Sequence, residues 1–451
     1  MADARNTALA VLNKLEQGKQ TLDAILEDMT CSEDNLSKRE RALFNALTYG
    51  VLRRRGRLDY IIAHFSNTPV KKIEPSVLNI LRLGLFQIIY LDRIPDSAAV
   101  NTAVELSKRT GLSRATGFVN ALLRKAALNF SSVQFPAFET DPLAFLAANQ
   151  SLPSWLADRW LNRLDPAALM KLCDTVNSIP PLSIRTNTLK TTRRQLISAL
   201  EQAVERIEPT PHAPDGLSLV NPGQSIVEFA AFKNGWFQVQ DEAAQLVSLL
   251  LDPQPDESVL DACAGLGGKT GHIAQLMQNN GRITAMDKDE NKLQKLDLEM
   301  QRLGVSIVHR CCYDLNSPPD ADQHALFDRI LLDAPCSGLG VLRRNPDIKW
   351  NSTEASLKRH AARQKRFLDH LAACVKPGGI LVYSVCSIEP EENEAVINAF
   401  LKKHPGFGID IHWGKLPERV ASLFESARWI KTHPLLNNMD GFFLVRLKRI
   451  I

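Results

Sequence analysis

Apolar positions in the first 130 residues recur at intervals of three and four, the spacing of an amphipathic α-helix. Ser37 is expected to cap a helix that runs on into a basic segment, with Glu40 as its capping-box partner. Strand-like alternation is missing from this part of the sequence, so residues 1–130 are predicted to form an all-helical domain. Helices are expected over residues 5–28, from 38 to the run Arg53–Arg57, and over Leu58–Phe65, Ser76–Leu91, Ser97–Thr110 and Arg114–Leu128.

The next stretch, residues 129–142, has the composition of a loop and is expected to link two domains. Beyond it, segments with the helical spacing of apolar residues are mixed with short segments typical of strands. Helices are predicted at 143–148, 153–164, 166–177 and 191–203, and strands at 182–185 and 217–220. We expect residues 143–235 to form a small α+β module.

From residue 235 onward, short apolar and β-branched segments alternate with amphipathic segments of helical length. Such alternation predicts a doubly wound, mostly parallel sheet for residues 236–451. In such sheets, ligands bind beyond the carboxyl ends of the strands. Strands are predicted at 235–239, 259–263, 281–287, 306–310, 329–332 and 378–386, helices at 241–251, 270–277, 291–303, 357–374 and 391–403, and a pair of strands near the end of the chain.

The 451 residues are too many for one core and predict two or three domains. The chain has no apolar run long enough to span a bilayer, and its first residues lack the apolar core of a signal peptide. Eight cysteines are present without a CxxC pair or a His-rich spacing, which argues against structural zinc and a disulfide framework. We therefore expect a cytoplasmic protein with reduced thiols, no membrane association and no metal.

Charge is distributed unevenly although the net charge is only +4. Residues 1–140 contain 19 Lys and Arg against 14 Asp and Glu, whereas the remaining residues are near neutral. The run Arg53–Arg57 fits either a solvated helix end or a phosphate contact, since the planar guanidinium suits phosphate. A basic N-terminal part is a weak indication of a polyanionic partner.

A glycine-rich turn follows the predicted strand at 259–263. It is not a P-loop, because Cys263 stands five positions before Gly268 where that motif needs glycine, and it fails the dinucleotide fingerprint at Thr270. Asp287, 22 residues after Gly265, is placed to accept hydrogen bonds from ribose hydroxyls. S-adenosylmethionine fits such a turn because it carries adenosine without phosphates. Asp314 would then lie near the adenine.

Two predicted strands end near a cysteine, Cys336 in an Asp-Ala-Pro-Cys sequence and Cys386 in Ser-Val-Cys-Ser. A thiolate that adds to carbon 6 of a pyrimidine turns carbon 5 into a nucleophile for a methyl donor. An acid at N3, such as Asp333, would favour that addition, and a base must later remove the carbon 5 proton. These residues alone leave open which cysteine is the nucleophile.

Four segments, DACAGLGGKT, LLDAPCSGLGVLRRNPDIKW, VYSVCSIEPEENE and DGFFLVRLKR, together resemble the RNA (cytosine-5) methyltransferases. With the helical N-terminal region, the resemblance extends over almost the whole chain to the bacterial members that methylate 16S ribosomal RNA. It implies an α/β, Rossmann-like S-adenosylmethionine-dependent methyltransferase domain, a small α+β middle module, and an all-helical N-terminal domain similar to the RNA-binding factor NusB. The implied product is 5-methylcytosine.

The resemblance also implies roles for individual residues. Cys386 would be the nucleophile and Cys336 would help to release the product, although DNA enzymes use the Pro-Cys cysteine as nucleophile. Asp333 would lie beside both the cofactor and the reacting base. We expect 16S ribosomal RNA as the partner and a monomeric enzyme. The residues expected to bind S-adenosylmethionine are Cys263, Ala264, Gly265, Leu266, Gly267, Gly268, Lys269, Asp287, Asp314 and Asp333.

Several further residues are candidates for RNA contact. Arg343, Arg344 and Lys349 are predicted to meet phosphates, unless they belong to a solvated loop. Arg185 and Asn187 are also expected at the RNA, whereas Trp350 and Phe442 would stack on a base or pack in the core. Lys269 is expected to contact the cofactor carboxylate or Asp333, or to be a solvated lysine.

The chain departs from the family pattern at two places. The family usually has Ala-Pro where this chain has Gly265-Leu266, and threonine where it has Val385. We expect altered cofactor affinity rather than loss of chemistry. Two other functions remain as alternatives, namely an RNA-binding assembly factor without activity and a methyltransferase for DNA or a small molecule.

Overall fold

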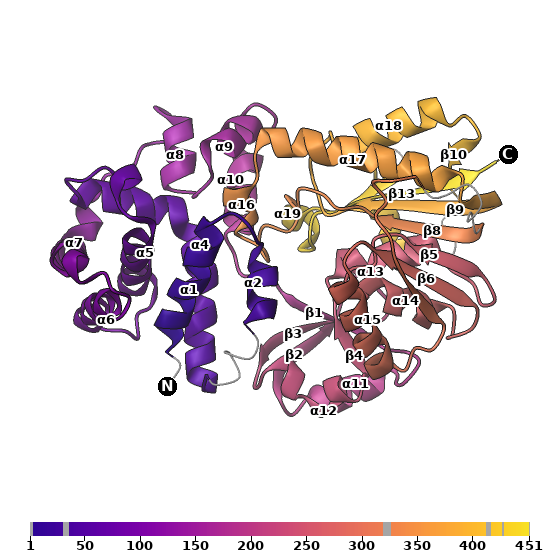
Figure 1. Cartoon of the computed structure of the whole chain (residues 1–451), viewed down its shortest axis with the longest axis horizontal. Coiled ribbons are helices and arrows are strands. Elements are labelled where there is room, and N and C mark those ends of the chain that lie inside the picture. Colours follow the sequence, from indigo (N-terminus) through magenta and orange to yellow (C-terminus); the bar gives the residue numbers. More distant parts are fainter. Residues whose placement is uncertain (1–2, 30–35, 319–325, 412–415, 426–427, 451) are drawn as a thin grey trace. The chain divides into compact units, whose positions relative to one another are not determined.

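The computed structural model describes residues 3–29, 36–318, 326–411, 416–425 and 428–450. Cys31 lies outside them. The chain forms two compact units, one of Met1–Ser178 with Leu342–Ser352 and one of Ile179–Val341 with Thr353–Ile451 (Figure 1). None of the described helices has the length and apolarity that crossing a membrane would require.

The first unit is helical, as predicted for the N-terminal part of the chain. Its apolar helix faces meet in a core that includes Phe44, Ile80 and Leu123. Its helices are α1 (Ala4–Glu16), α2 (Leu22–Asp28), α4 (Lys38–Phe65), α5 (Pro75–Tyr90), α6 (Asp96–Arg109), α7 (Thr116–Asn129), α8 (Pro142–Ala148), α9 (Ser154–Leu161), α10 (Pro166–Val176) and α16 (Ile348–Asn351).

The long helix α4 corrects two sequence predictions. Leu58–Phe65 is not a separate helix, because α4 continues through Gly56, where a Cβ would lie 2.5 Å from the Ala147 carbonyl oxygen. Ser37 does cap α4, since its hydroxyl accepts a hydrogen bond from the Glu40 amide. The Glu40 side chain, however, accepts from the Ala4 amide at 2.8 Å, so it ties α4 to α1 rather than completing a capping box.

The second unit contains a small antiparallel sheet in the order β2-β3-β1-β4. The sequence analysis predicted β1 and β3 but missed β2, because its side chains are mostly exposed and show no apolar alternation. Apolar residues such as Ile184, Leu217 and Phe237 form its core. The elements are β1 (Leu182–Thr186), α11 (Arg193–Leu200), β2 (Val204–Pro209), β3 (Gly216–Pro222), α12 (Ala230–Lys233) and β4 (Phe237–Val239).

The larger sheet has a parallel part in the order β7-β6-β5-β8-β9, which β13 extends antiparallel to β9. The order reverses next to β5, so the loops after β5 and β8 diverge and leave space for a ligand. The elements are α13 (Glu242–Leu251), β5 (Ser258–Asp261), α14 (Gly268–Leu276), β6 (Arg282–Asp287), α15 (Glu290–Leu303), β7 (Val308–Cys312), β8 (Phe327–Asp333), α17 (Glu354–Ala372), β9 (Val375–Val385), α18 (Glu394–Lys403), β10 (Phe407–Ile409), β11 (Phe424–Glu425), β12 (Trp429–Lys431), α19 (Pro434–Asn437) and β13 (Phe443–Arg449).

Helices cover both faces of this sheet (Figure 1). Side chains on one face of the sheet, such as those of Val259 and Val382, pack with α13, α14 and α15. Side chains on the other face, such as those of Leu260 and Leu381, pack with α17 and α18. A strand buried on both faces is apolar at successive positions, which explains the continuous apolar runs in the sequence.

Candidate active site

Five loops meet at the carboxyl edge of the parallel strands. They follow β5, β6, β7, β8 and β9, and each loop, or the last residue of the strand before it, includes a residue that the sequence analysis singled out. Because parallel strands end at the same edge of the sheet, loops far apart in sequence converge there. The site is built from these loops.

The glycine turn after β5 leads into α14. Gly265 and Gly267 have φ values of +56° and +86°, a region that favours glycine. A Cβ on Gly267 would also lie 2.9 Å from the Leu296 and Met300 side chains. The Gly265 amide donates a hydrogen bond to Asp287 Oδ2 at 3.0 Å. The turn is therefore fixed to the end of β6.

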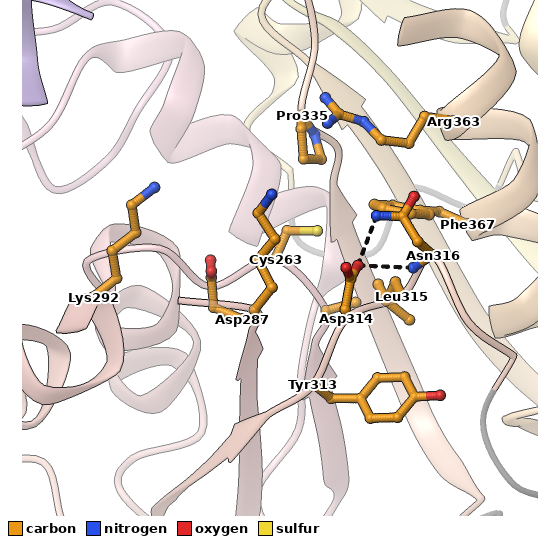
Figure 2. Close-up of a pocket in the computed structure, with 12 residues that line it drawn as sticks. Cys263, Asp287, Lys292, Tyr313, Asp314, Leu315, Asn316, Pro335, Arg363 and Phe367 are labelled. Atoms are coloured by element: carbon orange, nitrogen blue, oxygen red, sulfur yellow. Dashed lines mark hydrogen bonds between the residues drawn. The ribbon is translucent and has the colours of Figure 1, made fainter. Parts of the chain in front are cut away.

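A pocket lies beside this turn (Figure 2). It includes the predicted residues Cys263, Asp287 and Asp314, and Figure 2 shows the two acids near the ends of neighbouring strands. Asp314 Oδ1 accepts hydrogen bonds from the Asn316 backbone and side-chain amides at 2.9 and 2.8 Å. Leu315 and other apolar groups complete the wall. Two acids and apolar groups in one pocket fit the ribose hydroxyls and the base of an adenosine.

Cys263 is not a candidate nucleophile, although it lines the pocket. Burial raises the pKa of its thiol well above the ordinary range, and the nearby carboxylates of Asp261, Asp333 and Asp287 raise it further. A thiol in that state stays protonated at neutral pH and reacts slowly. Its place in the wall suits packing against a ligand.

The loops after β8 and β9 bring the two predicted cysteines together. The sulfurs of Cys336 and Cys386 lie 3.3 Å apart, although the residues are 50 positions apart in sequence. The Gly340 amide donates to the Cys386 carbonyl oxygen at 3.0 Å, which joins the two turns through their backbones. The hydrogen bond with Cys386 is the largest cause that raises the pKa of Cys336, followed by burial.

Asp333, at the end of β8, accepts hydrogen bonds from two sides. Lys269 Nζ donates to Oδ2 and Ser384 Oγ donates to Oδ1, both at 2.6 Å. Burial alone would lower the pKa of Lys269, but the Asp333 carboxylate outweighs it and raises that pKa, with a smaller contribution from Cys386. The Lys269 ammonium therefore stays charged beside the Asp333 carboxylate and within electrostatic reach of Cys386.

Comparisons with known proteins identify the family of this chain. The family model "16S rRNA methyltransferase RsmB/F" matches residues 248–448, a NusB family model matches 2–128, and the ferredoxin-like domain of RsmF/B-like methyltransferases matches 152–225. The Bacillus subtilis protein named "Probable ribosomal RNA small subunit methyltransferase B" is 37% identical over 449 residues, 99% of this chain and 98% of that protein. The chain belongs to the RsmB/F family of 16S rRNA methyltransferases.

Two further relatives support this assignment. The ribosomal RNA small subunit methyltransferase B of Yersinia pseudotuberculosis is 36% identical over 401 residues, which cover 88% of this chain and 89% of that protein. A methyltransferase homologue from Pyrococcus horikoshii, known from its crystal structure, is 31% identical with a TM-score of 0.58, and the match covers 69% of this chain and 99% of that one. The protein is an S-adenosylmethionine-dependent methyltransferase of small-subunit ribosomal RNA with a NusB-like N-terminal domain.

For this RsmB/F family member, two predicted RNA contacts are wrong. Lys349 is fully buried, and its ammonium donates to the Arg53 carbonyl oxygen at 3.0 Å and to Asn177 Oδ1 at 2.9 Å. Arg343 is only 2% exposed. Both belong to Leu342–Ser352, which packs in the helical unit, so neither side chain is available to a phosphate.

The middle-module candidates are buried as well. Arg185 is 1% exposed and donates to Gln238, Gln240 and the Gly268 carbonyl oxygen. Asn187 donates to the carbonyl oxygens of Gly235 and Leu303 at 2.8 Å. These residues fasten the small sheet to the methyltransferase fold and do not face RNA.

The aromatic candidates pack rather than stack on a base. Trp350 donates from its indole nitrogen to the Leu52 carbonyl oxygen at 2.8 Å, and Phe442 is 6% exposed in the core. The run Arg53–Arg57 lies within α4 and not at a helix end, with Arg55 paired to Glu16. A local sequence pattern could not reveal these partners.

Some residues of the site escaped the sequence analysis. Lys292, Tyr313, Arg363 and Phe367 line the pocket with Asp287 and Asp314. They carry no motif, since each stands in an ordinary helix or strand-end context. The i, i+4 spacing of Arg363 and Phe367 in a helix was the one usable signal, because it places both on the same face of α17.

Proposed function

We propose that the protein methylates carbon 5 of a cytosine in 16S ribosomal RNA through a covalent adduct between Cys386 and carbon 6. The observation that carries this proposal is the pair of thiols 3.3 Å apart beside the ion pair of Lys269 and Asp333. Both thiols and the acid are needed for the reaction, and the fold collects them at the ends of two neighbouring strands, β8 and β9.

S-adenosylmethionine would occupy the pocket beside the glycine turn and supply an electrophilic methyl group. The loop Cys263–Lys269 would hold it, with Asp287 at the ribose hydroxyls, Asp314 near the adenine and Asp333 towards the cationic sulfur. The pocket fits because its acids are oriented by neighbouring amides while its remaining wall contains apolar groups.

The first step is the attack of the Cys386 thiolate on carbon 6. A carbon–sulfur bond forms, and the electron pair of the C5–C6 double bond moves into the ring towards N3. Asp333 would hold the proton that N3 takes up as the electron pair arrives, and Lys269 can supply that proton through its 2.6 Å hydrogen bond to Asp333. Carbon 5 is then nucleophilic enough to take the methyl group.

The second half of the reaction needs a base for the carbon 5 proton, and Cys336 is the closest candidate. Its pKa is raised mainly by its hydrogen bond with Cys386. Once the Cys386 sulfur is bonded to carbon 6, it no longer carries a negative charge, so the pKa of Cys336 falls. A larger fraction of Cys336 is then thiolate, the form that can accept the carbon 5 proton. Removal of the proton restores the C5–C6 double bond and expels the Cys386 thiolate.

The test uses RNA that contains 5-fluorocytosine, because fluorine at carbon 5 cannot leave as a proton and the adduct is trapped. The wild-type protein should form an adduct that survives denaturing electrophoresis. Cys386→Ala should form none and should lose at least roughly 10³-fold in methylation rate, as expected for removal of a nucleophile.

Cys336→Ala provides the complementary result. It should form the adduct on ordinary RNA and accumulate it, while turnover falls by roughly 10²–10⁴-fold, the usual cost of a lost general base. If Cys336→Ala prevented the adduct and Cys386→Ala accumulated it, the two roles would have to be exchanged. Methylation by Cys386→Ala at the wild-type rate would rule out the covalent route.

Two further expectations belong to this proposal. We retain a helical RNA-binding domain, an α+β module and a catalytic domain, which were predicted at 1–130, 143–235 and 236–451, but α8, α9 and α10 belong to the helical unit and β4 belongs to the small sheet. We also retain a monomeric enzyme. Sedimentation of the purified protein with and without 16S ribosomal RNA measures its oligomeric state directly.

A further inference from the structure

We infer that Glu392 is a positioning residue that holds the two cysteine turns together and so sets the distance between the Cys336 and Cys386 sulfurs. Glu392 follows β9 in the segment that leads to α18, and its side chain is fully buried. The inference rests on the proposed function, because it matters for catalysis only if both thiols react.

The carboxylate of Glu392 accepts hydrogen bonds from the residue after each cysteine. Ser337, next to Cys336, donates its backbone amide at 2.8 Å and its hydroxyl at 2.5 Å. Ser387, next to Cys386, donates its hydroxyl at 2.6 Å to the same oxygen that accepts from the Ser337 hydroxyl. One carboxylate thus bridges the two turns that carry the cysteines.

A fourth donor extends the bridge to the other side of Cys336. Gln364 on α17 donates from its side-chain amide to Glu392 at 3.0 Å and to the Pro335 carbonyl oxygen at 3.2 Å. The Tyr383 hydroxyl in turn donates to the backbone carbonyl oxygen of Glu392 at 2.6 Å. The turn around Cys336 is held on both flanks, and the bridging residue is itself anchored to β9.

The lack of a lysine or arginine partner within the described part of the chain supports a positioning role. Among the described residues, no lysine or arginine forms an ion pair with Glu392, although the carboxylate is fully buried. A buried charge is costly, and an apolar replacement of similar volume is often no less stable. Four converging donors compensate the charge, and a carboxylate can accept a hydrogen bond from each of them. Stability alone therefore gives little reason for glutamate here, whereas fixing two turns does.

The substitution Glu392→Gln tests the inference because it keeps the shape and replaces one acceptor oxygen by a donor. The first measurement is the rate at which diamide, an oxidant of thiols, links Cys336 to Cys386 in the full-length protein. In that reaction two thiols lose two protons and two electrons to diamide as the S–S bond forms, and peptide mapping identifies the linked pair. We expect the rate to fall at least about tenfold, the effect of losing one charge-assisted hydrogen bond.

The second measurement is steady-state methylation. The kcat of Glu392→Gln should fall at least about tenfold, again the equivalent of one charge-assisted hydrogen bond, while KM for RNA and for S-adenosylmethionine stays near the wild-type values. Glu391→Gln, one residue away with the same change of charge, is the matched control and should leave both measurements unchanged. Ser337→Ala and Ser387→Ala each remove one donor and replace Glu392→Gln if that variant does not fold.

The possible outcomes separate the two proposals. A lower melting temperature with unchanged linking rate and kcat would make Glu392 merely structural and overturn the inference. Methylation that persists in Cys386→Ala would instead refute the proposed function, and the diamide result would still report whether Glu392 sets the sulfur distance.

Discussion

At the scale of single residues, the active site depends on which ionisable groups are charged. The Lys269 ammonium keeps its charge because the Asp333 carboxylate lies 2.6 Å away. Cys263 stays a thiol because burial and nearby carboxylates raise its pKa. The surroundings of a cysteine thus set the pKa of its thiol, and the neighbouring sulfur 3.3 Å away distinguishes Cys336 and Cys386 from Cys263.

Asp261 at the end of β5 gives a pH-dependent prediction. Burial raises the pKa of this carboxyl to about 7, although the Thr270 hydroxyl donates to it. Between about pH 4, near the unfolded pKa, and pH 7, the unfolded chain has released a proton that the folded protein keeps, so folding stability falls as the pH rises. The substitution Asp261→Asn removes this fall of folding stability with rising pH.

The measurement for Asp261 is urea unfolding of wild type and Asp261→Asn at several pH values. The free energy of unfolding of Asp261→Asn, taken relative to that of wild type, should rise by roughly 1–3 kcal/mol between pH 4.5 and pH 7.5, since each pKa unit corresponds to about 1.4 kcal/mol. Asp297→Asn, on the more exposed surface of α15, is the control and should follow the wild type. A constant difference between Asp261→Asn and wild type across this range would contradict the prediction.

At the scale of elements, the segment Leu342–Ser352 shows how a basic sequence can become internal. It follows the turn that carries Cys336, yet it packs within the helical unit. Asp347 accepts from the Leu22 amide at 3.0 Å, and Arg53 donates to the Arg343 carbonyl oxygen at 2.9 Å. The buried side chains of Arg343 and Lys349 therefore serve the fold of that unit rather than a nucleic acid.

Lys349 in α16 gives the corresponding prediction. Burial, with a smaller effect of Arg54, lowers its pKa to about 7. Between pH 7 and about 10 the unfolded chain holds a proton that the folded protein lacks, so wild-type stability rises with pH. Lys349→Met removes both this dependence and two hydrogen bonds.

We therefore expect the stability lost in Lys349→Met to grow between pH 7 and pH 9, as measured by urea unfolding. The salt dependence of RNA binding should stay the same as in wild type, because no phosphate contact is removed. A shallower salt dependence in Lys349→Met would restore the original prediction of a phosphate contact. Lys358→Met, on the exposed side of α17, is a control for stability.

At the scale of the whole molecule, the two compact units have different architectures. The methyltransferase unit carries the cysteine pair and the pocket, whereas the helical unit matches the NusB family. A ligand that binds the folded pocket stabilises that unit by mass action, because the unfolded chain has no pocket.

S-adenosylmethionine should thus raise the melting temperature of the protein. At 100 times its Kd the added stability is about 2.7 kcal/mol, which corresponds to several degrees for a unit of this size. Asp287→Ala should remove most of the shift, because it deletes the carboxylate proposed for the ribose and the acceptor of the Gly265 amide. The control variant Asp297→Ala should show the full shift in melting temperature. An undiminished shift in Asp287→Ala would exclude this residue from the cofactor site.

Periodicity and the order of elements were sufficient to place the glycine turn, Asp287, Asp314, Asp333 and both cysteines at one edge of a sheet. The reason is that parallel strands share a direction, so every strand end reaches the same side. No local pattern predicted the burial or the hydrogen-bond partners of Arg185, Lys349 and Glu392. Lys349 meets a partner 172 positions away, and Glu392 meets Ser337 at a separation of 55. A charged side chain is exposed or buried according to such distant partners, which come together only when the chain has folded.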